Sequence, residues 1–476
     1  MVDTDSFLKK IRAWLGCLLL TVVLTSTLCV PIAYADVRNS DIIKGNTVSS
    51  QGFSASLCPS INAEYAYLVD ANGEVFFERN SSERVQIASL TKIMTALVSV
   101  EYGDLDNTTI TVSQNAASIG ESSASLKAGD SMSLRTALKA LMVCSGNDAA
   151  VAIAESMGND ILKKLPKNSQ DSNFPTNGYD AFVYAMNLKA KELGMNDSLF
   201  ANPHGLDFDQ YDQEMYSTAK DVYLMSKAFM ADSYLSSIVS NESESITVVR
   251  DNTEVELVLE STDELLGNYN GACGIKTGFT NKAGACFAGA CNKNNKMIYS
   301  VVLGSSDEAQ RFADTKALWN WYYDNYINYN FVHSDEKTSY KTNDGEEITV
   351  PVVAYESHKG WVDKTFKVTL ENPNEYVEVF RLDGNVSQEF HFDDVVADVH
   401  VGDKVGTVDF KQNNQVVASA TVVAAEECAG PNFLEGIGVW FDRLIRTFTG
   451  QETEAQSVIV NKTPVLISGN SASSNF

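Results

Sequence analysis

The chain lacks the short patterns that mark metal-dependent and redox enzymes. Its eight cysteines include no C-x-x-C pair, which argues against a zinc ribbon or a thioredoxin-like redox site. Its five histidines are scattered, and no H-E-x-x-H pattern is present. We therefore expect a protein that needs no catalytic metal and no cofactor.

Positive charge is also scarce. The chain has 36 Lys and Arg against 62 Asp and Glu, a formal net charge of −26. This balance argues against a nucleic-acid partner and against electrostatic capture by anionic lipid, because both need a basic surface. A soluble acidic surface is the simpler interpretation, and 476 residues are enough for two or three domains.

The N-terminus has the features of a secretory signal, and we assign residues 1–35 to it. A short basic segment precedes an apolar stretch over 13–32, and Ala33-Tyr34-Ala35 resembles a signal-peptidase site. The apolar stretch is long enough for an uncleaved membrane anchor, but Pro31 and the Ala-x-Ala sequence favour cleavage. The sequence therefore predicts an exported protein.

Export would allow disulfides among the six cysteines of the mature chain. Cys273 and Cys291 flank a predicted hairpin and could face each other. The alternative is that the cysteines are buried free thiols.

The region after the signal is predicted to contain a linker, 36–57, and a catalytic domain, 58–326. Strands are expected at both ends of this domain and helices between them, with a loop or insertion over 159–178. This order predicts an α/β (α+β) fold with an antiparallel sheet and a helical cluster beside it. The expected strands are 65–70, 74–78, 247–249, 255–259, 272–280, 286–291 and 297–303, and the expected helices are 87–102, 134–143, 149–157, 179–193 and 308–326.

The C-terminal third changes character. Residues 327–427 contain five strand-like segments and are predicted to form a small all-β domain, in which Pro351 indicates an edge strand. Residues 431–449 are predicted to form an amphipathic, membrane-associating helix, although packing on the β domain is the alternative. Residues 450–476 are polar and are expected to be a disordered tail.

Three short motifs occur in one order along the predicted catalytic domain. They are Ser89-Leu90-Thr91-Lys92, Ser145-Gly146-Asn147 and Lys276-Thr277-Gly278. The S-x-x-K pattern occurs four times in the chain, but K-T-G occurs once. Only the copy at Ser89 opens an apolar helical run and is followed by the other two motifs.

The first motif suits nucleophilic catalysis. Ser89 and Lys92 are three residues apart, so they share one face of a helix. A serine hydroxyl needs a base, and a lysine can serve if burial and a nearby cation lower its pKa. An isolated S-x-x-K is more often an ordinary helix start with a capping serine.

The other two motifs could complete the site. The Ser145 hydroxyl could relay a proton and the Asn147 amide could orient Lys92, although Ser-Gly-Asn-Asp is also good turn chemistry. The third motif could be only a surface strand. If it is functional, Lys276 and Thr277 could hold a substrate carboxylate, Gly278 would clear space for the substrate, and the Phe279 N–H could form an oxyanion hole with the Ser89 N–H.

On these motifs, the chain resembles the low-molecular-weight penicillin-binding proteins that act as serine-type D-alanyl-D-alanine carboxypeptidases. The resemblance extends to segments 145–150, 202–207, 274–284 and 401–406. It implies that Ser89 is acylated and that Lys92 is its base. It also implies that Ser145 and Asn147 relay a proton and position the reacting groups, among them Lys92. Lys276 and Thr277 would bind the terminal carboxylate.

The same resemblance implies a substrate, an inhibitor and a location. The enzyme would remove the last D-alanine from a peptidoglycan stem pentapeptide, and β-lactams would acylate Ser89. It would lie peripherally at the extracytoplasmic face of the bacterial cell membrane, held by the C-terminal helix.

Three alternatives remain open on sequence alone. One is a class A β-lactamase, which needs a Glu-x-x-x-Asn loop where this chain has Asn202-Pro203-His204-Gly205-Leu206. A second is a DD-endopeptidase that cuts cross-links. The third is a non-catalytic wall-binding protein on the same fold.

Overall fold

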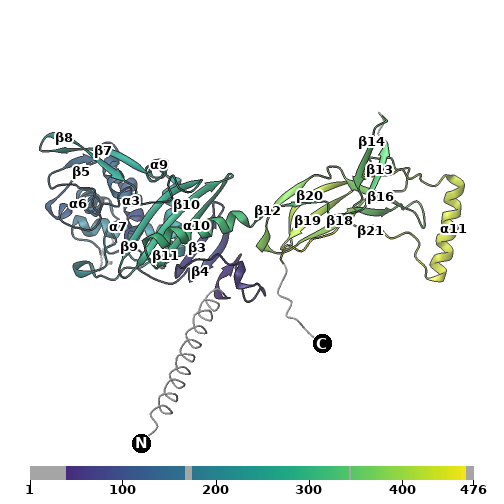
Figure 1. Ribbon diagram of the computed structural model, residues 1–476, viewed down its shortest axis with the longest axis horizontal. Coiled ribbons are helices and arrows are strands. Elements are labelled where there is room, and N and C mark those ends of the chain that lie inside the picture. The colour runs from purple at the N-terminus through teal and green to yellow at the C-terminus, as the bar shows by residue number, and fades with distance from the viewer. Residues whose placement is uncertain (1–38, 167–173, 342–344, 468–476) are drawn as a thin grey trace, which may run out of the picture. The chain divides into compact units, whose positions relative to one another are not determined.

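The chain divides into two compact units, one ending at Tyr322 and the other beginning at Tyr323 (Figure 1). The sequence placed this boundary after residue 326. The computed structural model describes residues 39–166, 174–341 and 345–467. The predicted signal, 1–35, lies outside the described residues.

Unit 1 is built on a seven-stranded antiparallel sheet with the order β2-β1-β4-β3-β11-β10-β9. In its centre β3 pairs with β11, with Val69 opposite Tyr299. Strands from the two ends of the domain are therefore neighbours, as the sequence predicted. The strands are β1 (Ile42–Ile43), β2 (Asn46–Thr47), β3 (Tyr65–Asp70), β4 (Val75–Arg79), β9 (Ala272–Thr280), β10 (Gly284–Lys293) and β11 (Lys296–Ser305).

Helices cover both faces of this sheet. On one face, Tyr223 of α8 (Ala219–Ala231) makes an edge contact with Tyr299, at 5.8 Å between ring centroids. On the other, the indole Nε1 of Trp319 in α10 (Glu308–Asp324) donates to the Ser300 hydroxyl at 2.9 Å. Adjacent residues of one strand point to opposite faces, so β11 is buried on both sides. The sheet therefore lies between α10 on one face and α8 on the other.

The helical cluster follows the predicted order. The expected loop over 159–178 is partly wrong, because α6 continues to Lys164 and α7 begins at Gly178. Residues 167–173 lie outside the described residues. The helices are α3 (Thr91–Tyr102), α4 (Gln114–Ala117), α5 (Leu134–Met142), α6 (Asn147–Lys164), α7 (Gly178–Glu192), α8 (Ala219–Ala231), α9 (Ser233–Val239) and α10 (Glu308–Asp324). A four-stranded sheet lies beside them, formed by β5 (Thr109–Thr111), β6 (Ser131–Ser133), β7 (Ser243–Arg250) and β8 (Thr253–Glu260).

The expected linker, 36–57, is wrong for the residues from 39 onward. Strand β1 pairs with β4, so this segment extends the main sheet. The fully buried Asp41 forms a bidentate ion pair with Arg79, at 2.7 and 2.8 Å. A strand of two residues is too short to show an alternation of apolar and polar residues, so the sequence pattern did not indicate these strands.

Unit 2 is all-β apart from one long helix and a short 3-10 turn. Pro351 ends β14 in a two-stranded sheet with β13, in agreement with its predicted edge position. The strands are β12 (Tyr326–Asn330), β13 (Lys337–Lys341), β14 (Glu347–Pro351), β15 (Ala354–Ser357), β16 (Thr365–Leu370), β17 (Tyr376–Phe380), β18 (Val386–Phe392), β19 (Lys404–Gln412), β20 (Gln415–Ala424) and β21 (Val458–Ile459), and the helix is α11 (Phe433–Thr449).

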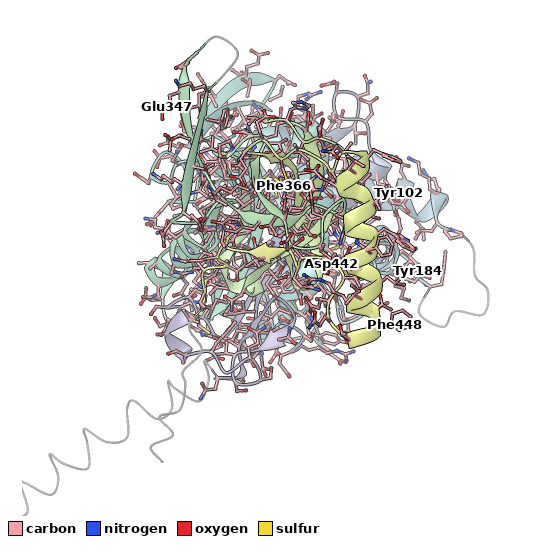
Figure 2. All side chains as sticks on the ribbon, turned by 90° about the vertical axis from the view of Figure 1, so that its right-hand side faces the viewer. Tyr102, Tyr184, Glu347, Phe366, Asp442 and Phe448 are labelled. Carbon is pink, nitrogen blue, oxygen red and sulfur yellow. The ribbon has the colours of Figure 1, made fainter. Side chains whose placement is uncertain are left out.

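Helix α11 is amphipathic, and its apolar side chains face outward. Val439 is its buried residue, whereas Phe433 and Phe448 are 83% and 84% exposed. Figure 2 looks onto this helix, with Asp442 and Phe448 labelled. The helix does contact the β domain, as the alternative held, since Arg443 donates to the carbonyls of Lys359 and Trp361, but most of its apolar face is exposed. No helix within the described ranges is long and apolar enough to cross a membrane.

The expected disordered tail, 450–476, is wrong for residues 451–467. Strand β21 pairs with β15. The Asn461 side chain is buried, donates to the Phe331 carbonyl at 2.8 Å and accepts from the His333 N–H at 2.7 Å. This polar segment is held by hydrogen bonds, which composition does not reveal. Residues 468–476 lie outside the described residues.

The six cysteines of the described residues are free thiols. Cys291 lies opposite Ala272 in the β9–β10 pair, so Cys273 is displaced by one residue and points to the other face. The proposed Cys273–Cys291 pairing is therefore wrong. Burial raises the pKa of the Cys144 thiol, beside Ser145, to about 11.

Candidate active site

Ser89 lies in a 3-10 turn, η2 (Ala88–Leu90), that leads directly into α3. Ala88 adopts a φ of +48°, a left-handed conformation that is costly for a residue with a Cβ. Such outliers persist where the surrounding fold fixes them, often at functional sites. The turn places Ser89 in the lining of a pocket, while α3, which follows it, is buried from Thr91 to Ser99.

Lys92 connects the first two motifs. Its ammonium Nζ lies 2.7 Å from Ser89 Oγ and 2.7 Å from the carboxamide oxygen of Asn147. It also donates to the backbone carbonyl of His204 at 3.2 Å. The three acceptors come from η2, α6 and the loop after α7. Tertiary structure therefore fixes the position of this amine.

The electrostatic surroundings favour a neutral Lys92. Its side chain is fully buried, and burial lowers its pKa well below the usual value of 10.5. The nearby charge of Lys276 lowers the pKa further. A lysine with a depressed pKa can accept the proton of a serine hydroxyl that lies within hydrogen-bond distance.

The second motif lies between α5 and α6. Asn147 begins α6; its amide Nδ2 donates to the Gly120 carbonyl at 3.1 Å, while its oxygen accepts from Lys92. Ser145 lines the same pocket and holds a left-handed φ of +62°. Among the described residues, its hydroxyl makes no hydrogen bond with Lys92, so the predicted relay is not preformed in this state.

The third motif lies on β9, within the strand predicted over 272–280, and β9 is an edge strand of the main sheet. Lys276 is almost fully buried, and burial lowers its pKa to about 7, an effect that the charge of Arg311 reinforces. Thr277 faces the pocket, and its hydroxyl lies 2.6 Å from that of Thr262. Lys276 does not line the pocket, and its Nζ donates to the Thr277 carbonyl at 3.2 Å, so of these two residues only Thr277 reaches the pocket.

Gly278 lines the pocket, and its missing side chain has an effect on packing that the sequence did not predict. A Cβ built on it would lie 3.0 Å from the Ile87 carbonyl oxygen and 3.1 Å from the Ser89 nitrogen. The glycine thus allows β9 to approach the turn that carries the nucleophile. This packing brings the backbone of β9 beside the Ser89 N–H. Phe279, the next residue, is 47% exposed and lines the pocket.

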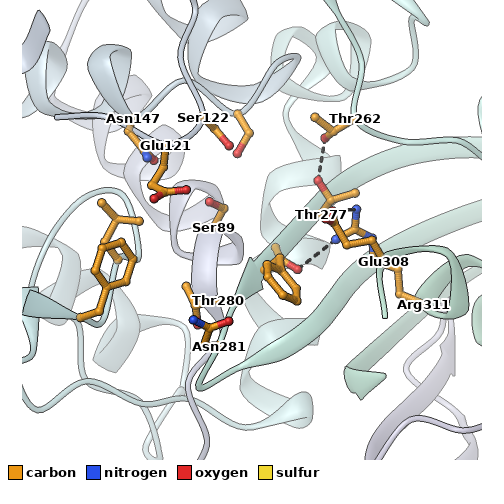
Figure 3. A pocket seen from close by; sticks show the side chains of 15 residues that line it. Ser89, Glu121, Ser122, Asn147, Thr262, Thr277, Thr280, Asn281, Glu308 and Arg311 are labelled. Atoms are coloured by element: carbon orange, nitrogen blue, oxygen red, sulfur yellow. Dashed lines mark hydrogen bonds and ion pairs between the residues drawn. The ribbon is translucent and has the colours of Figure 1, made fainter. Parts of the chain in front are cut away.

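These residues surround a pocket of 460 Å³ (Figure 3). Its lining includes charged groups that the motifs did not indicate. Arg311 of α10 donates to the Gly278 carbonyl at 3.1 Å and pairs with Glu308 at 3.0 Å. Glu121, from the loop after α4, also lines the pocket. These side chains lie far from the motifs along the chain, and no local pattern points to them.

Asp148 is a second residue that sequence reasoning missed. Its carboxylate accepts from the Ser123 hydroxyl at 2.6 Å and from the N–H groups of Ala124 and Leu126 at 3.1 and 3.2 Å. It therefore fixes the loop that forms one wall of the pocket. The one sequence feature that could have indicated Asp148 is its position directly after Asn147 of the second motif.

Comparison with known proteins agrees with this geometry. Residues 51–161 and 173–307 match the D-alanyl-D-alanine carboxypeptidase family. The chain is 29% identical to the D-alanyl-D-alanine carboxypeptidase DacF of Bacillus subtilis over 379 residues, covering 78% of this chain and 87% of DacF. It is 31% identical to DacC of Escherichia coli over 275 residues, but these span only 55% of this chain and 62% of DacC.

Solved structures share the fold. A cysteine-to-alanine variant of a Streptomyces DD-transpeptidase aligns with a TM-score of 0.50 at 25% identity, covering 56% of this chain and all of that one (100%). DacD of Francisella tularensis aligns with a TM-score of 0.50 over 78% of this chain and 96% of its own, at 23% identity, which supports the fold alone. The chain belongs to the D-alanyl-D-alanine carboxypeptidase family and is a serine peptidase.

Proposed function

We propose that the protein removes the terminal D-alanine from peptidoglycan stem pentapeptides through an acyl-Ser89 intermediate. The observation that carries the proposal is the position of Lys92, whose buried amine lies 2.7 Å from both Ser89 Oγ and Asn147 Oδ1. This arrangement supplies a base, a nucleophile and a group that orients the base.

In the acylation step, Ser89 Oγ attacks the carbonyl carbon of the D-Ala–D-Ala bond and its proton passes to neutral Lys92. The N–H groups of Ser89 and Phe279 hold the resulting oxyanion. The C–N bond then breaks, and the leaving amine takes a proton through Ser145. Water attacks the acyl ester while Lys92 accepts its proton, which releases the shortened peptide and restores Ser89.

The substrate's terminal carboxylate would lie at the cationic side of the pocket. Arg311 and Thr277 line that side of the pocket, and the Thr277 hydroxyl supplies a donor. Lys276 does not line the pocket and would act on the carboxylate through its charge. β-Lactams carry a carboxylate and a strained amide at comparable positions. We therefore expect them to acylate Ser89 as covalent inhibitors.

The test uses residues 36–476 and a Ser89→Ala variant with a fluorescent penicillin and a stem pentapeptide. We expect labelling and D-alanine release by the wild type only. Equal labelling of the variant would refute Ser89 as the nucleophile. Labelling without release by the wild type would refute the carboxypeptidase reaction.

A second reaction is the cutting of cross-links. A D-alanyl-D-alanine endopeptidase of Pseudomonas aeruginosa is 30% identical over 260 residues, covering 54% of this chain and 76% of that enzyme. Incubation with a cross-linked dimer of stem peptides distinguishes the two reactions, because endopeptidase action yields monomers. Rapid nitrocefin turnover, rather than slow stoichiometric acylation, would instead indicate a β-lactamase.

We also propose that α11 holds the exported protein at the outer face of the cell membrane. Several of its large apolar side chains are exposed, among them Trp440 and Ile445 at 59% each. Arg443, on the polar side, donates to the carbonyls of Lys359 and Trp361 at 2.5 and 3.1 Å, which ties the helix to unit 2. An interfacial helix needs this arrangement of an apolar outer face and a polar inner one.

Co-sedimentation with phosphatidylcholine vesicles tests this proposal. We expect Trp440→Glu to weaken binding, because the charge would enter the headgroup boundary. Val396→Glu is the matched control, since Val396 is also 59% exposed in unit 2 but lies outside α11. Equal binding by wild type and Trp440→Glu would contradict the proposal.

A further inference from the structure

Charges in the pocket are divided between two sides of the nucleophile. Figure 3 shows Ser89 between Glu121 on one side and Thr277 and Arg311 on the other, with the Glu121 carboxylate directed into the pocket. A ligand that spans the pocket therefore meets Thr277 and the Arg311–Glu308 ion pair at one end and the Glu121 carboxylate at the other.

The two glutamates of the pocket differ in their partners. Glu308 is paired with Arg311 at 3.0 Å, so its charge is compensated within the protein. Glu121 is exposed to the pocket, and its carboxylate forms no ion pair or hydrogen bond within the described part of the chain. Its charge is therefore available to a bound molecule.

The backbone around Glu121 is held by the second motif. The Gly120 carbonyl accepts from Asn147 Nδ2 at 3.1 Å, and the Ser122 carbonyl accepts from the Asn147 N–H at 2.8 Å. Between these contacts Glu121 has a left-handed φ of +58°, a conformation that is costly for a residue with a Cβ. The same asparagine that orients Lys92 thus fixes the position of this carboxylate.

We propose that Glu121 selects stem peptides whose third residue carries a free amine. The inference rests on the proposed function, which places the terminal carboxylate near Thr277 and Arg311 and the scissile carbonyl at Ser89. The remainder of the peptide then extends past Ser89 toward Glu121. The side chain of the third residue, one position before the acylated D-alanine, comes close to the carboxylate.

The expected effect is moderate, because Glu121 is open to solvent. Exposed ion pairs contribute about 0.2–1 kcal/mol, which corresponds to a preference of at most roughly fivefold. Salt screens such a pair, so the preference should decrease as the ionic strength rises.

The experiment compares kcat/KM for D-alanine release from two pentapeptides that differ only in L-lysine or Nε-acetyl-lysine at position three. We expect the wild type to prefer the free amine by roughly two- to fivefold, Glu121→Gln to lose the preference, and Glu121→Lys to reverse it. The control is Glu254→Gln, the same substitution at an exposed glutamate outside the pocket, and it should leave the preference unchanged. Penicillin acylation rates report whether each variant is folded.

Three results would overturn the inference. The first is release from both peptides at equal rates by the wild type. The second is an unchanged preference in Glu121→Gln. The third is equal slowing of both peptides by that variant with accumulation of acyl-enzyme, which would make Glu121 a group for deacylation. Failure of the wild type to release D-alanine from either peptide would instead refute the proposed function.

Discussion

The carbonyl oxygen of Ala88 packs against the α-carbon of Gly205 so closely that a Cβ on Gly205 would lie 1.9 Å from it. Ala88 precedes the nucleophile, and Gly205 follows His204, whose carbonyl accepts from Lys92. This contact joins the turn that carries Ser89 to the loop that holds its base.

Gly205→Ala should therefore reduce penicillin acylation by more than tenfold, because the turn and the loop must separate. Gly194→Ala is the matched control. Both glycines have positive φ, +89° and +79°, but a Cβ on Gly194 would meet nothing within 4 Å. Its substitution should cost only backbone strain of about 1 kcal/mol. Equal acylation rates for the two variants would contradict this account of the site.

The pH dependence of carboxylate binding should follow the protonation state of Lys276. Burial lowers the pKa of Lys276 to about 7, so its cationic form dominates below that pH in the free enzyme. Carboxylate recognition should accordingly weaken as pH rises above 7. The ratio of acylation rates for a penicillin and its methyl ester isolates this effect, because Lys92 serves both. A ratio that stays constant from pH 5 to 9 would exclude the assigned role of Lys276.

The hydroxyl pair Thr262–Thr277 should affect substrate binding more than chemistry. Their oxygens lie 2.6 Å apart, and loss of one hydrogen bond costs about 1 kcal/mol. Thr262→Val should raise KM for the pentapeptide by roughly fivefold with little change in kcat. Thr262→Ser retains the hydroxyl and should behave as the wild type. A fall in kcat at unchanged KM would place Thr262 in the chemical step instead.

Glu356 in β15 should make unit 2 less stable at alkaline pH. Its side chain is 1% exposed, and neither carboxylate oxygen has a hydrogen-bond partner among the described residues. Burial, with the nearby Asp393, raises the pKa of Glu356 from 4.5 to about 8, although Lys359 acts in the opposite direction. Between these pH values the folded chain keeps a proton that the unfolded chain has lost, so the unfolding free energy falls as pH rises.

Glu356→Gln removes this titration and should raise the Tm at pH 8 more than at pH 5. The Tm should change by about 2–4 °C for each kcal/mol of unfolding free energy. Asp314→Asn is the control. Asp314 is also buried, but its carboxylate accepts from the N–H groups of Asn62 and Ala63 at 2.7 and 2.8 Å. That substitution should lower the Tm at both pH values. An equal change of Tm for Glu356→Gln at both pH values would argue against a buried, titrating carboxyl.

The core of the site could be predicted because its chemistry is encoded in short motifs. Ser89 and Lys92 share one helical segment, and Asn147 and Thr277 belong to recognisable patterns. The pocket walls could not be predicted in this way. Glu121 and Arg311 reach the pocket only through tertiary packing, and neither lies in a local pattern that distinguishes it from a surface charge.

The fold was predictable where elements are long and periodic, and less so where they are short. The β9–β10–β11 meander and α10 followed the hydrophobic pattern. The segment around Asp41 did not, since its strands have two residues and its main anchor is an ion pair with Arg79. The Cys273 prediction failed because a shift of one residue in a hairpin reverses the face of a side chain.

The central claim is that a buried, uncharged Lys92 activates Ser89, and the rate of acylation by a penicillin methyl ester between pH 5 and 9 tests it most directly. Burial and the charge of Lys276 lower the pKa of Lys92, so the wild-type rate should rise with pH through an inflection well below 10.5. Lys92→Arg cannot lose its proton, so it should acylate about 10²–10⁴ times more slowly and show no such rise. Acylation of Lys92→Arg at the wild-type rate, with circular dichroism confirming that both proteins are folded, would contradict the account.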